Sequence, residues 1–393
     1  MNNHHSGPDS SAHPSPGARL SARGASGWEA SDRGEPPRSA SRSSLPSGTP
    51  AQVVSPPQVA EAAEPGPTAL SPVIRDWMWR GWQVRYRVVL PAQVQSSWPP
   101  LLCLHGFGAS GQHWRHNLGV WGQHTPTYAL DLLGFGASEK AAAPYNPAFW
   151  GELVADFCQE FIGQPCVLVG NSLGSVVTMT VAQQRPQWVR GLVWVNLPDN
   201  SLVLPSIPAA IDRWIRPLQR WSQPLSRGLQ WAGTGPWVIN PILAVVRSPR
   251  LLYPALASAY GDKNAVDGEL RSLVRDPAHD RHAAQALRFI TRGMGQIPAS
   301  LRAKRVVPQL QVPILLLWGQ CDRLVPPALG PACAALNPRI RLVEVAGAGH
   351  CLQDECPDRV NAWVLEWVQT QVMGQTIRVE TPNEVSQPLA DSP

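Results

Sequence analysis

Lysine is scarce in this sequence of 393 residues. Only Lys140, Lys263 and Lys304 occur, so almost all of the 33 basic residues are arginine. They are offset by 28 acidic residues, which leaves a net charge of +5, and no run rich in Lys and Arg is present. Because surfaces that bind nucleic acid usually carry such a basic cluster, we expect no nucleic-acid partner.

The sequence also lacks a long apolar run and any pattern of metal-binding cysteines. No stretch of about 18 uninterrupted apolar residues is present, which predicts no membrane-spanning helix. The seven cysteines are scattered and form no CxxC pair, which indicates reduced, structural cysteines. His113, His116 and His124 have no partnered carboxylates nearby in the sequence. We therefore expect neither a metal nor a cofactor.

Aromatic residues are almost missing from the first part of the chain. Residues 1–72 contain 12 Pro, 14 Ser and 7 Gly but a single aromatic residue, Trp28. Such a composition cannot bury enough surface to offset the loss of chain entropy. We predict a disordered tail that is dispensable for activity, and a second flexible tail at 374–393. No apolar secretory region is present, so a cytoplasmic location is expected, with plastid import left open by the Ser- and Arg-rich start.

The remaining chain alternates between strand and helix patterns. The alternating segment Trp82–Leu90 predicts a half-buried strand, and two helical faces are expected over Phe149–Ile162 and Val360–Val368. Short, fully apolar runs of the kind found in covered parallel strands are Leu101–Leu104, Tyr128–Leu130, Cys166–Val169, Leu192–Val195, Ile314–Trp318 and Leu342–Val345. This alternation predicts an α/β fold with a mostly parallel, doubly wound sheet.

Residues 197–300 interrupt this alternation. They are rich in Pro, Trp and Arg, and they predict a mostly helical cap inserted between two strands of a core that spans 73–196 and 301–373. An insertion on the carboxyl side of the sheet lies where ligands bind in such folds. The Trp and Arg residues favour an apolar pocket and peripheral contact with a membrane surface. The alternative is that they merely pack a cap over a small substrate.

A candidate nucleophile follows one of the buried strands. Gly170-Asn171-Ser172-Leu173-Gly174 is a G-x-S-x-G motif that begins directly after Cys166–Val169 and opens an apolar helical pattern. This strand–turn–helix context predicts an elbow that exposes the Ser172 hydroxyl at the top of the sheet. The tight turn requires small residues on both sides, which Gly170 and Gly174 supply.

A serine nucleophile needs a base, and the base needs an acid to orient it. In folds with this elbow the expected chain order is Ser, then acid, then His. His350 follows the strand that ends near Val345, and no other histidine lies so late in the chain. Asp322 follows the strand Ile314–Trp318 and is the favoured acid, while Asp199, after an earlier strand, remains the alternative.

The oxyanion that forms on attack needs backbone N–H donors. Leu173, directly after the nucleophile, supplies one, and Phe107 in His105-Gly106-Phe107-Gly108 supplies the other. His105 is expected to make structural hydrogen bonds rather than to act as the base. Asp131 is expected to organise the loop that follows it.

The elbow, the acid and histidine loops and the loops at His105 and Asp131 together resemble those of the α/β-hydrolases, over roughly residues 73–373. The form Gly-Asn-Ser-Leu-Gly, together with Tyr260, Val266–Leu270 and Asp276-Pro277-Ala278, is similar to the pheophytinase and chlorophyll-dephytylase-like hydrolases of plants and cyanobacteria. The resemblance implies an α/β-hydrolase fold and a cofactor-free hydrolase. It also implies a lipophilic, phytyl-type ester as the substrate.

Three hypotheses about function follow from the residues. The first is hydrolysis of a carboxylic ester by Ser172, His350 and Asp322. The second keeps the same three residues for carbon–carbon bond hydrolysis or perhydrolysis. The third is a non-catalytic binding protein that has kept the fold. Dehalogenase and epoxide-hydrolase chemistry is disfavoured, because those enzymes place Asp where this chain has Ser172.

Overall fold

A computed structural model of the chain describes residues 70–93, 97–202, 235–294 and 297–374. The two predicted tails therefore lie almost entirely outside the described residues, and so does the part of the insert at 203–234, which includes Trp214, Trp221 and Trp231. Among the described residues, no helix has the length and apolar character needed to cross a membrane.

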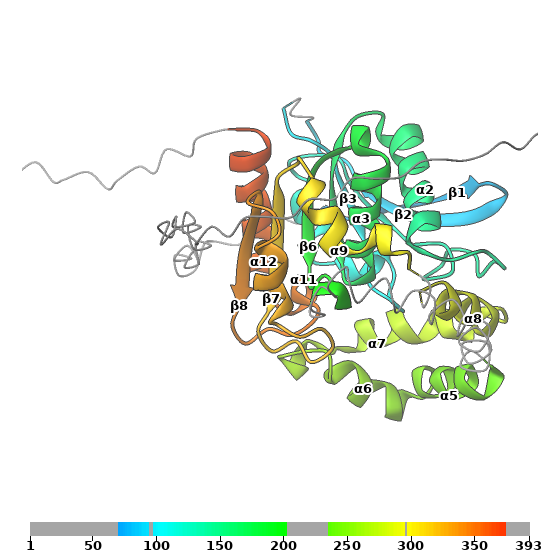
Figure 1. The fold of residues 1–393 in the computed structure, drawn as a ribbon. Helices are drawn as coiled ribbons and strands as arrows, with labels where there is room; N and C mark the ends of the chain where they lie inside the picture. Colours follow the sequence, from blue (N-terminus) through cyan, green and yellow to red (C-terminus); the bar gives the residue numbers. More distant parts are fainter. Residues whose placement is uncertain (1–69, 94–96, 203–234, 295–296, 375–393) are drawn as a thin grey trace, which may run out of the picture. The chain divides into compact units, whose positions relative to one another are not determined.

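Eight strands form a single sheet in the order β1-β2-β4-β3-β5-β6-β7-β8 (Figure 1). β2 runs antiparallel to both of its neighbours, β1 and β4, and the pairings from β4 to β8 along the sheet are all parallel. The strands are β1 (Val73–Trp79), β2 (Trp82–Val89), β3 (Leu101–Leu104), β4 (Thr127–Leu130), β5 (Cys166–Asn171), β6 (Val189–Val195), β7 (Ile314–Gly319) and β8 (Ile340–Val345). The expected mostly parallel sheet is confirmed.

The edge strand β1 was not recognisable from the sequence. Its first four residues are all exposed, so it lacks the alternation of apolar and polar residues that marks a half-buried strand. It is joined to β2 by a hairpin whose turn residues, Arg80 and Gly81, both have positive φ, at 51° and 87°. Turns of this kind match the right-handed twist of the strands they connect.

Helices cover both faces of the sheet, because successive side chains of a strand point to opposite sides. Leu102 and Leu104 pack with α2 (Pro147–Phe157) and α3 (Leu173–Gln184), whereas Leu101 and Cys103 pack against the other face. That second face is covered by the segments α1 (Leu118–Trp121), α12 (Pro357–Trp367) and η1 (Gly111–Trp114). The sheet is thus doubly wound, as predicted.

Between β6 and β7 the chain forms a helical insert. Its longer helices are α5 (Pro236–Arg247), α6 (Pro249–Ala257), α7 (Gly268–Arg275) and α8 (Ala283–Met294). In Figure 1, α7 and α8 lie nearer to the strands than α5 and α6 do. The chain then returns through α9 (Ala303–Val306) to β7, and α10 (Leu329–Ala334) and α11 (Leu352–Glu355) follow β7 and β8.

Short 3-10 and π segments complete the described structure. They are η2 (Cys158–Ile162), η3 (Pro186–Trp188), η4 (Asn200–Leu202), η5 (Lys263–Ala265), η6 (Asp276–His279), η7 (Ala299–Leu301), η8 (Val307–Gln309) and η9 (Val368–Val372).

Candidate active site

Ser172 lies in a sharp turn between β5 and α3. Its backbone has φ 52° and ψ −115°, a conformation that L-residues rarely adopt. Its N–H donates to the carbonyl of Val195 on the neighbouring strand β6, at 2.9 Å. Backbone strain held in place by such surroundings is frequent at functional sites. The turn therefore has the geometry expected of a nucleophile elbow.

The glycines on either side of Ser172 allow the turn to close. A Cβ atom on Gly170 would lie 2.4 Å from the carbonyl carbon of Gly174, and one on Gly174 would lie 2.2 Å from the carbonyl oxygen of Leu104. Both distances are too short for real atoms, so larger residues at these positions would push α3 away from the sheet.

His350 and Asp322 meet at the carboxyl ends of β7 and β8. The Nδ1 atom of His350 lies 2.7 Å from Oδ2 of Asp322, and both side chains are buried. The other carboxylate oxygen of Asp322 accepts hydrogen bonds from the N–H groups of Leu324 and Val325, at 2.8 and 2.9 Å. Because a carboxylate only accepts, Nδ1 carries the proton and the second ring nitrogen of His350 is left as a base.

The backbone of His350 is tied to the strand that carries Ser172. The side-chain amide of Asn171 donates to the His350 carbonyl at 3.1 Å, and the amide of Asn196 donates to the same oxygen at 2.8 Å. Asn196 also accepts from the N–H of Gly319 at 3.0 Å. Two asparagines thus hold the histidine loop next to the elbow. Their roles were not recognised from the sequence, because Asn171 stood out only as part of the elbow motif and Asn196 belongs to no motif.

The alternative acid, Asp199, is engaged elsewhere. One of its oxygens accepts from the N–H of Ser201 at 2.7 Å, and the other accepts from the N–H of Ala303 in α9. These contacts cap the chain where it leaves and re-enters the core. The structure therefore brings Asp322, and not Asp199, to His350.

The loop after β3 passes directly against the elbow. A Cβ atom on Gly106 would lie 3.3 Å from Cβ of Ser172 and 2.8 Å from the side-chain oxygen of Asn171. Phe107 follows, half-exposed, with its ring 5.5 Å from that of Phe135. Leu173 is the first residue of α3, where backbone N–H groups have no partner inside the helix. Both residues expected to bind an oxyanion are therefore adjacent to Ser172, in sequence or in space.

His105 shapes this loop through both of its ring nitrogens. Nδ1 lies 2.7 Å from the carbonyl of Gly106, and Nε2 accepts from the N–H of Leu132 at 3.0 Å. Burial disfavours the imidazolium form and lowers the pKa of His105. With both nitrogens occupied, this residue makes the structural hydrogen bonds that the sequence suggested.

Asp131 organises the following loop. Its buried carboxylate accepts from the N–H groups of Gly111 and Ala137 at 2.7 and 2.8 Å, and it forms an ion pair with Arg87 at 2.9 Å. Among the described residues, no group of three or more His, Cys, Asp or Glu side chains could hold a metal ion.

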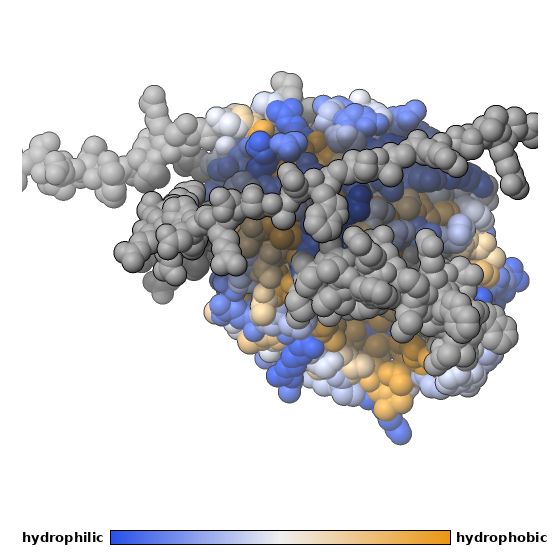
Figure 2. Space-filling view, viewed as in Figure 1, coloured by the Kyte–Doolittle hydropathy of each residue, from blue (hydrophilic) through white to orange (hydrophobic). Residues whose placement is uncertain are grey.

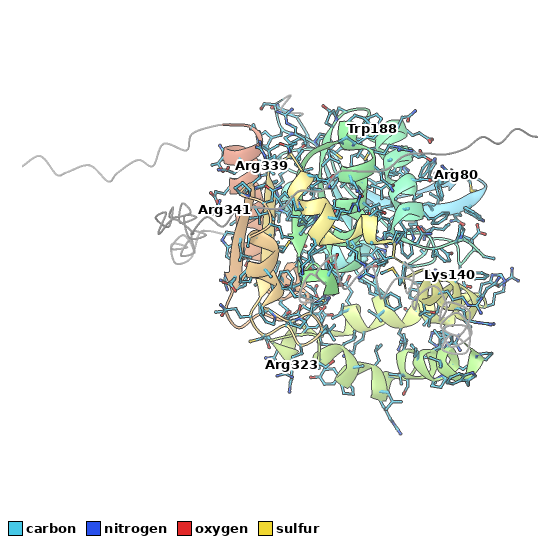
Figure 3. All side chains as sticks on the ribbon, in the orientation of Figure 1. Arg80, Lys140, Trp188, Arg323, Arg339 and Arg341 are labelled. Atoms are coloured by element: carbon cyan, nitrogen blue, oxygen red, sulfur yellow. The ribbon has the colours of Figure 1, made fainter. Side chains whose placement is uncertain are left out.

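An apolar pocket of about 110 Å³ lies where the helical insert meets the core loops. It is lined by Phe107, Gly108, Gly134, Phe135, Gly136, Lys140, Ile242, Leu243, Val246, Val274, Pro277, Ala278, Ala283, Leu287 and Ile290. Phe107, which forms part of one wall, directly follows Gly106, the residue that passes against the elbow. Figure 3 shows Lys140 beside the insert helices, and Arg323, next to Asp322, at the same end of the sheet. Arg339 lies at the opposite end.

The sequence model of the alpha/beta hydrolase family matches residues 101–363. The chain belongs to the α/β-hydrolase family. It is a hydrolase. The match begins at β3 and covers the strands from there to β8, the elbow and the insert, and it ends in α12, beyond His350.

Relatives of this hydrolase include a pheophytinase and an enzyme named for ester cleavage. It is 25% identical to the chloroplastic pheophytinase of Arabidopsis thaliana over 69% of this chain, which spans 61% of the plant protein. It is 30% identical to a pimeloyl-[acyl-carrier protein] methyl ester esterase of Xanthomonas axonopodis pv. citri, over 64% of this chain and 88% of that protein.

A solved structure shares the fold although it is named for epoxide hydrolysis rather than ester cleavage. The epoxide hydrolase CorEH covers 75% of this chain and 98% of its own, with a TM-score of 0.59 and 17% sequence identity. At that identity the likeness concerns the fold alone. Fold and family therefore do not determine the substrate, which has to be inferred from the residues at the site.

Proposed function

We propose that this protein is a cofactor-free serine hydrolase that cleaves carboxylic esters with a lipophilic group. The observation that carries the proposal is the hydrogen bond between His350 and Asp322, formed beside an elbow that holds Ser172. A buried carboxylate that fixes the tautomer of a histidine is what a serine nucleophile requires of its base. Ser172, rather than an aspartate, at the elbow favours ester cleavage over the chemistry named for CorEH.

The first step transfers the acyl group to the enzyme. His350 takes the proton of the Ser172 hydroxyl as its oxygen attacks the ester carbonyl carbon. The negative charge that develops on the carbonyl oxygen is bound by the N–H groups of Phe107 and Leu173. The bond to the alcohol oxygen then breaks, and His350 gives its proton to the departing alcohol, which leaves an ester between the acyl group and Ser172.

The second step returns the enzyme to its starting state. His350 takes a proton from a water molecule that attacks the acyl carbon, and the same N–H groups bind the oxyanion. The bond to Ser172 breaks, the serine oxygen recovers the proton from His350, and a carboxylic acid leaves. Asp322 stays ionised throughout and stabilises the imidazolium that forms twice in the cycle.

The helical insert acts as a cap that selects the lipophilic group. The apolar pocket beside Phe107 is built mainly from insert residues such as Ile242 and Ile290. Each methylene that it removes from water contributes up to about 0.8 kcal/mol to binding. The resemblance to pheophytinases favours a phytyl-type alcohol as the group that occupies the pocket.

The outer face of the insert suits a membrane surface. From 236 to 257 the chain has no acidic residue but carries Arg247 and Arg250. Trp237 and Leu251 are exposed to 67% and 51% in this stretch. Figure 2 shows hydrophobic surface gathered over α5 and α6. Helices with exposed Trp and Leu beside Arg bind at the interface of anionic lipid bilayers. We infer that the protein collects lipophilic esters at such a surface.

The hydrolysis of butyrate esters of linear alcohols with 2 to 16 carbons, together with phytyl butyrate, tests the substrate class. We expect kcat/KM to rise with chain length and to favour the phytyl ester. The Ser172→Ala variant should show no turnover on any of them. A preference for acetates of short alcohols would contradict the lipophilic substrate, while turnover by Ser172→Ala would contradict the nucleophile.

Co-sedimentation with liposomes tests the proposed contact between the insert and a membrane. Vesicles containing phosphatidylglycerol should bind the protein at low salt and release it at high salt. The double variant Trp237→Ser, Leu251→Ser should bind more weakly while it hydrolyses dissolved esters at the normal rate. Equal binding of both proteins to the vesicles, or none by either, would contradict the membrane contact.

A further inference from the structure

The helical insert contacts the histidine loop backbone to backbone. The N–H of His350 donates to the carbonyl of Ala259, which follows α6, at 2.7 Å. The approach is close enough to require glycines on both sides. A Cβ atom on Gly349 would lie 2.5 Å from the Ala259 oxygen, and one on Gly261 would lie 2.2 Å from the carbonyl oxygen of Gly347.

A single carboxylate holds these two segments together. Glu355, in α11, accepts from the N–H of Gly261 in the insert at 2.7 Å. It also accepts from the N–H groups of Gly349 and Cys351, on either side of His350, at 2.9 and 3.2 Å. Hydrogen bonds to an ionised acceptor are stronger than those between neutral groups. Glu355 therefore couples the position of the histidine loop to that of the insert.

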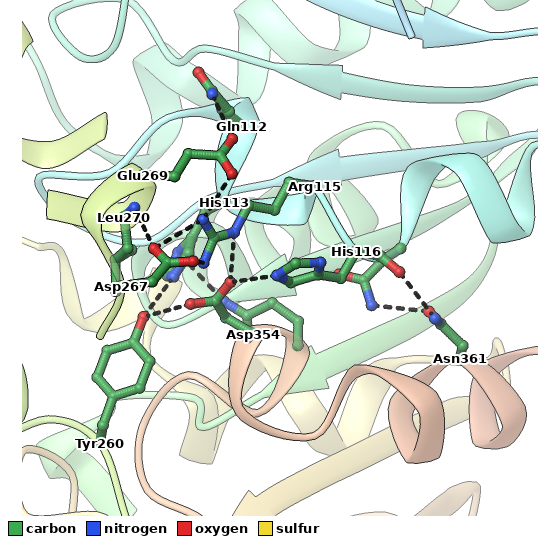
Figure 4. A network of polar contacts seen from close by, with 12 residues as sticks. Gln112, His113, Arg115, His116, Tyr260, Asp267, Glu269, Leu270, Asp354 and Asn361 are labelled. Carbon is green, nitrogen blue, oxygen red and sulfur yellow. Dashed lines mark hydrogen bonds and ion pairs between the residues drawn. The ribbon is translucent and has the colours of Figure 1, made fainter. Parts of the chain in front are cut away.

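The side chain of Tyr260 makes a second connection. Its hydroxyl lies 3.0 Å from Oδ2 of Asp354 and 3.0 Å from Nε2 of His113. Gln353 approaches the other nitrogen of His113 at 3.3 Å, and Arg115 donates to Asp354 at 3.0 Å. We call these five residues the Tyr260 cluster. Figure 4 labels all of them except Gln353, together with their neighbours.

The hydrogen bonds of the Tyr260 cluster have one consistent direction. Because the carboxylate of Asp354 only accepts, the hydroxyl of Tyr260 donates to it. The phenol oxygen then accepts from Nε2 of His113, whose Nδ1 accepts from the amide of Gln353. This arrangement needs a neutral His113. Removing the Tyr260 hydroxyl would leave a buried carboxylate and a buried N–H group each without one partner, which is costly.

Arg115 extends the attachment to α7. Its guanidinium forms ion pairs with Asp267 and Glu269 of the insert, both at 3.0 Å. Arg115 follows η1, the segment next in the chain after the loop that carries Phe107. The insert is thus attached to the segment after the proposed oxyanion loop and to the segment after His350.

We propose that Tyr260 is a positioning residue that links the docking of the insert to the orientation of His350. His350 then holds the geometry for proton transfer only while the segment Ala259–Gly261 lies in place. The proposal rests on the proposed function, since it assumes that His350 is the base. It goes beyond that function because it makes the insert a part of the catalytic machinery as well as a wall of the binding pocket.

The variant Tyr260→Phe removes the hydroxyl and keeps the ring. With p-nitrophenyl butyrate as substrate, we expect kcat to fall roughly tenfold to a hundredfold, which is the range that a small misplacement of a catalytic group produces. The KM should change less than about twofold. Tyr128→Phe is the matched control, because the Tyr128 hydroxyl lies 3.5 Å from the carbonyl of Phe161, in a pairing that involves no residue of the cluster. Its kcat should equal that of the wild type.

A proton NMR measurement separates this proposal from the proposed function. The proton shared by Nδ1 of His350 and Asp322 should give a far-downfield signal in the wild type and in Tyr128→Phe. It should be shifted or exchange-broadened in Tyr260→Phe at a temperature where circular dichroism shows a folded protein. If the wild type hydrolyses no ester, the proposed function fails, and the NMR comparison still decides the positioning role.

The role of Tyr260 would be overturned by a normal kcat and an unchanged downfield signal in Tyr260→Phe. Should that variant fail to fold, Glu355→Gln weakens the other connection at the same loop. It should reproduce the fall in kcat at constant KM together with the change in the NMR signal. A folded Glu355→Gln protein with wild-type kcat and signal would contradict the coupling equally.

Discussion

Oδ2 of Asp322 lies 2.7 Å from Nδ1 of His350, although the two residues are 28 positions apart in the chain. Their meeting follows from topology, because β7 and β8 are parallel neighbours and both loops leave the same edge of the sheet. At that edge the second oxygen of Asp322 is fixed by two backbone N–H groups. The carboxylate therefore reaches the histidine with its orientation already set.

Replacing this acid should slow turnover severely. We expect Asp322→Asn to lower kcat for p-nitrophenyl butyrate by about 10⁴, because an amide cannot hold the reactive tautomer or stabilise the imidazolium. Asp199→Asn is the matched control and should keep kcat within a few-fold of the wild type, since the hydrogen bonds of the Asp199 carboxylate to described residues come from the backbone N–H groups of Ser201 and Ala303. A larger loss from Asp199→Asn would mean that the acid has been misassigned.

Filling the apolar pocket should reverse the preference for chain length. Ala283 is buried at the start of α8 and lines the pocket, so Ala283→Phe occupies space needed by about two methylenes. We expect the ratio of kcat/KM for long over short esters to fall roughly tenfold. Ala299→Phe, at an exposed position outside the pocket, should leave the ratio unchanged. Equal ratios in the two variants would place the lipophilic group elsewhere.

The free energy of unfolding should decline as pH falls from about 6.5 to 4, in part because of His113. Burial disfavours its imidazolium form and lowers its pKa from 6.5 to about 4. In that interval the unfolded chain binds a proton that the folded protein does not, so stability is lost as pH falls. The contribution of this one group is at most about 3 kcal/mol.

Urea unfolding measured across this pH range checks the expectation. His113→Gln should show a shallower decline than the wild type, although it is less stable at pH 7 because the contact with Tyr260 is altered. His282→Gln, at an exposed position, should follow the wild-type curve. A His113→Gln curve parallel to that of the wild type would show that His113 titrates alike in both states. The lowered pKa of buried His105 should contribute a separate decline of the same sign.

The elements with strong local signals were predictable from sequence. Uniformly apolar runs identified the covered strands, and the two glycines around Ser172 identified the elbow, because both depend on contacts of adjacent residues. The pairing of His350 with Asp322 followed from where each residue leaves its strand. The edge strand β1 was missed because most of its side chains are exposed.

The contacts that position the histidine were beyond sequence reasoning. The hydroxyl of Tyr260 joins His113 and Asp354, which are 147 and 94 positions away. Asn196 reaches the carbonyl of His350 across 154 positions. No spacing rule marks such pairs, because they arise only when segments far apart in the chain meet in the folded protein. Tyr260 itself stood out in the sequence through a family resemblance alone.

Covalent labelling with a fluorophosphonate tests the central claim most directly. The reagent reacts with a serine whose hydroxyl is activated by a neighbouring base, and peptide mass spectrometry then locates the modified residue. We predict rapid, stoichiometric labelling of Ser172, none in Ser172→Ala, and much slower labelling in folded Asp322→Asn. Wild-type protein that stays unlabelled at Ser172, or that reacts at another serine, would contradict the assignment of a Ser172–His350–Asp322 hydrolase.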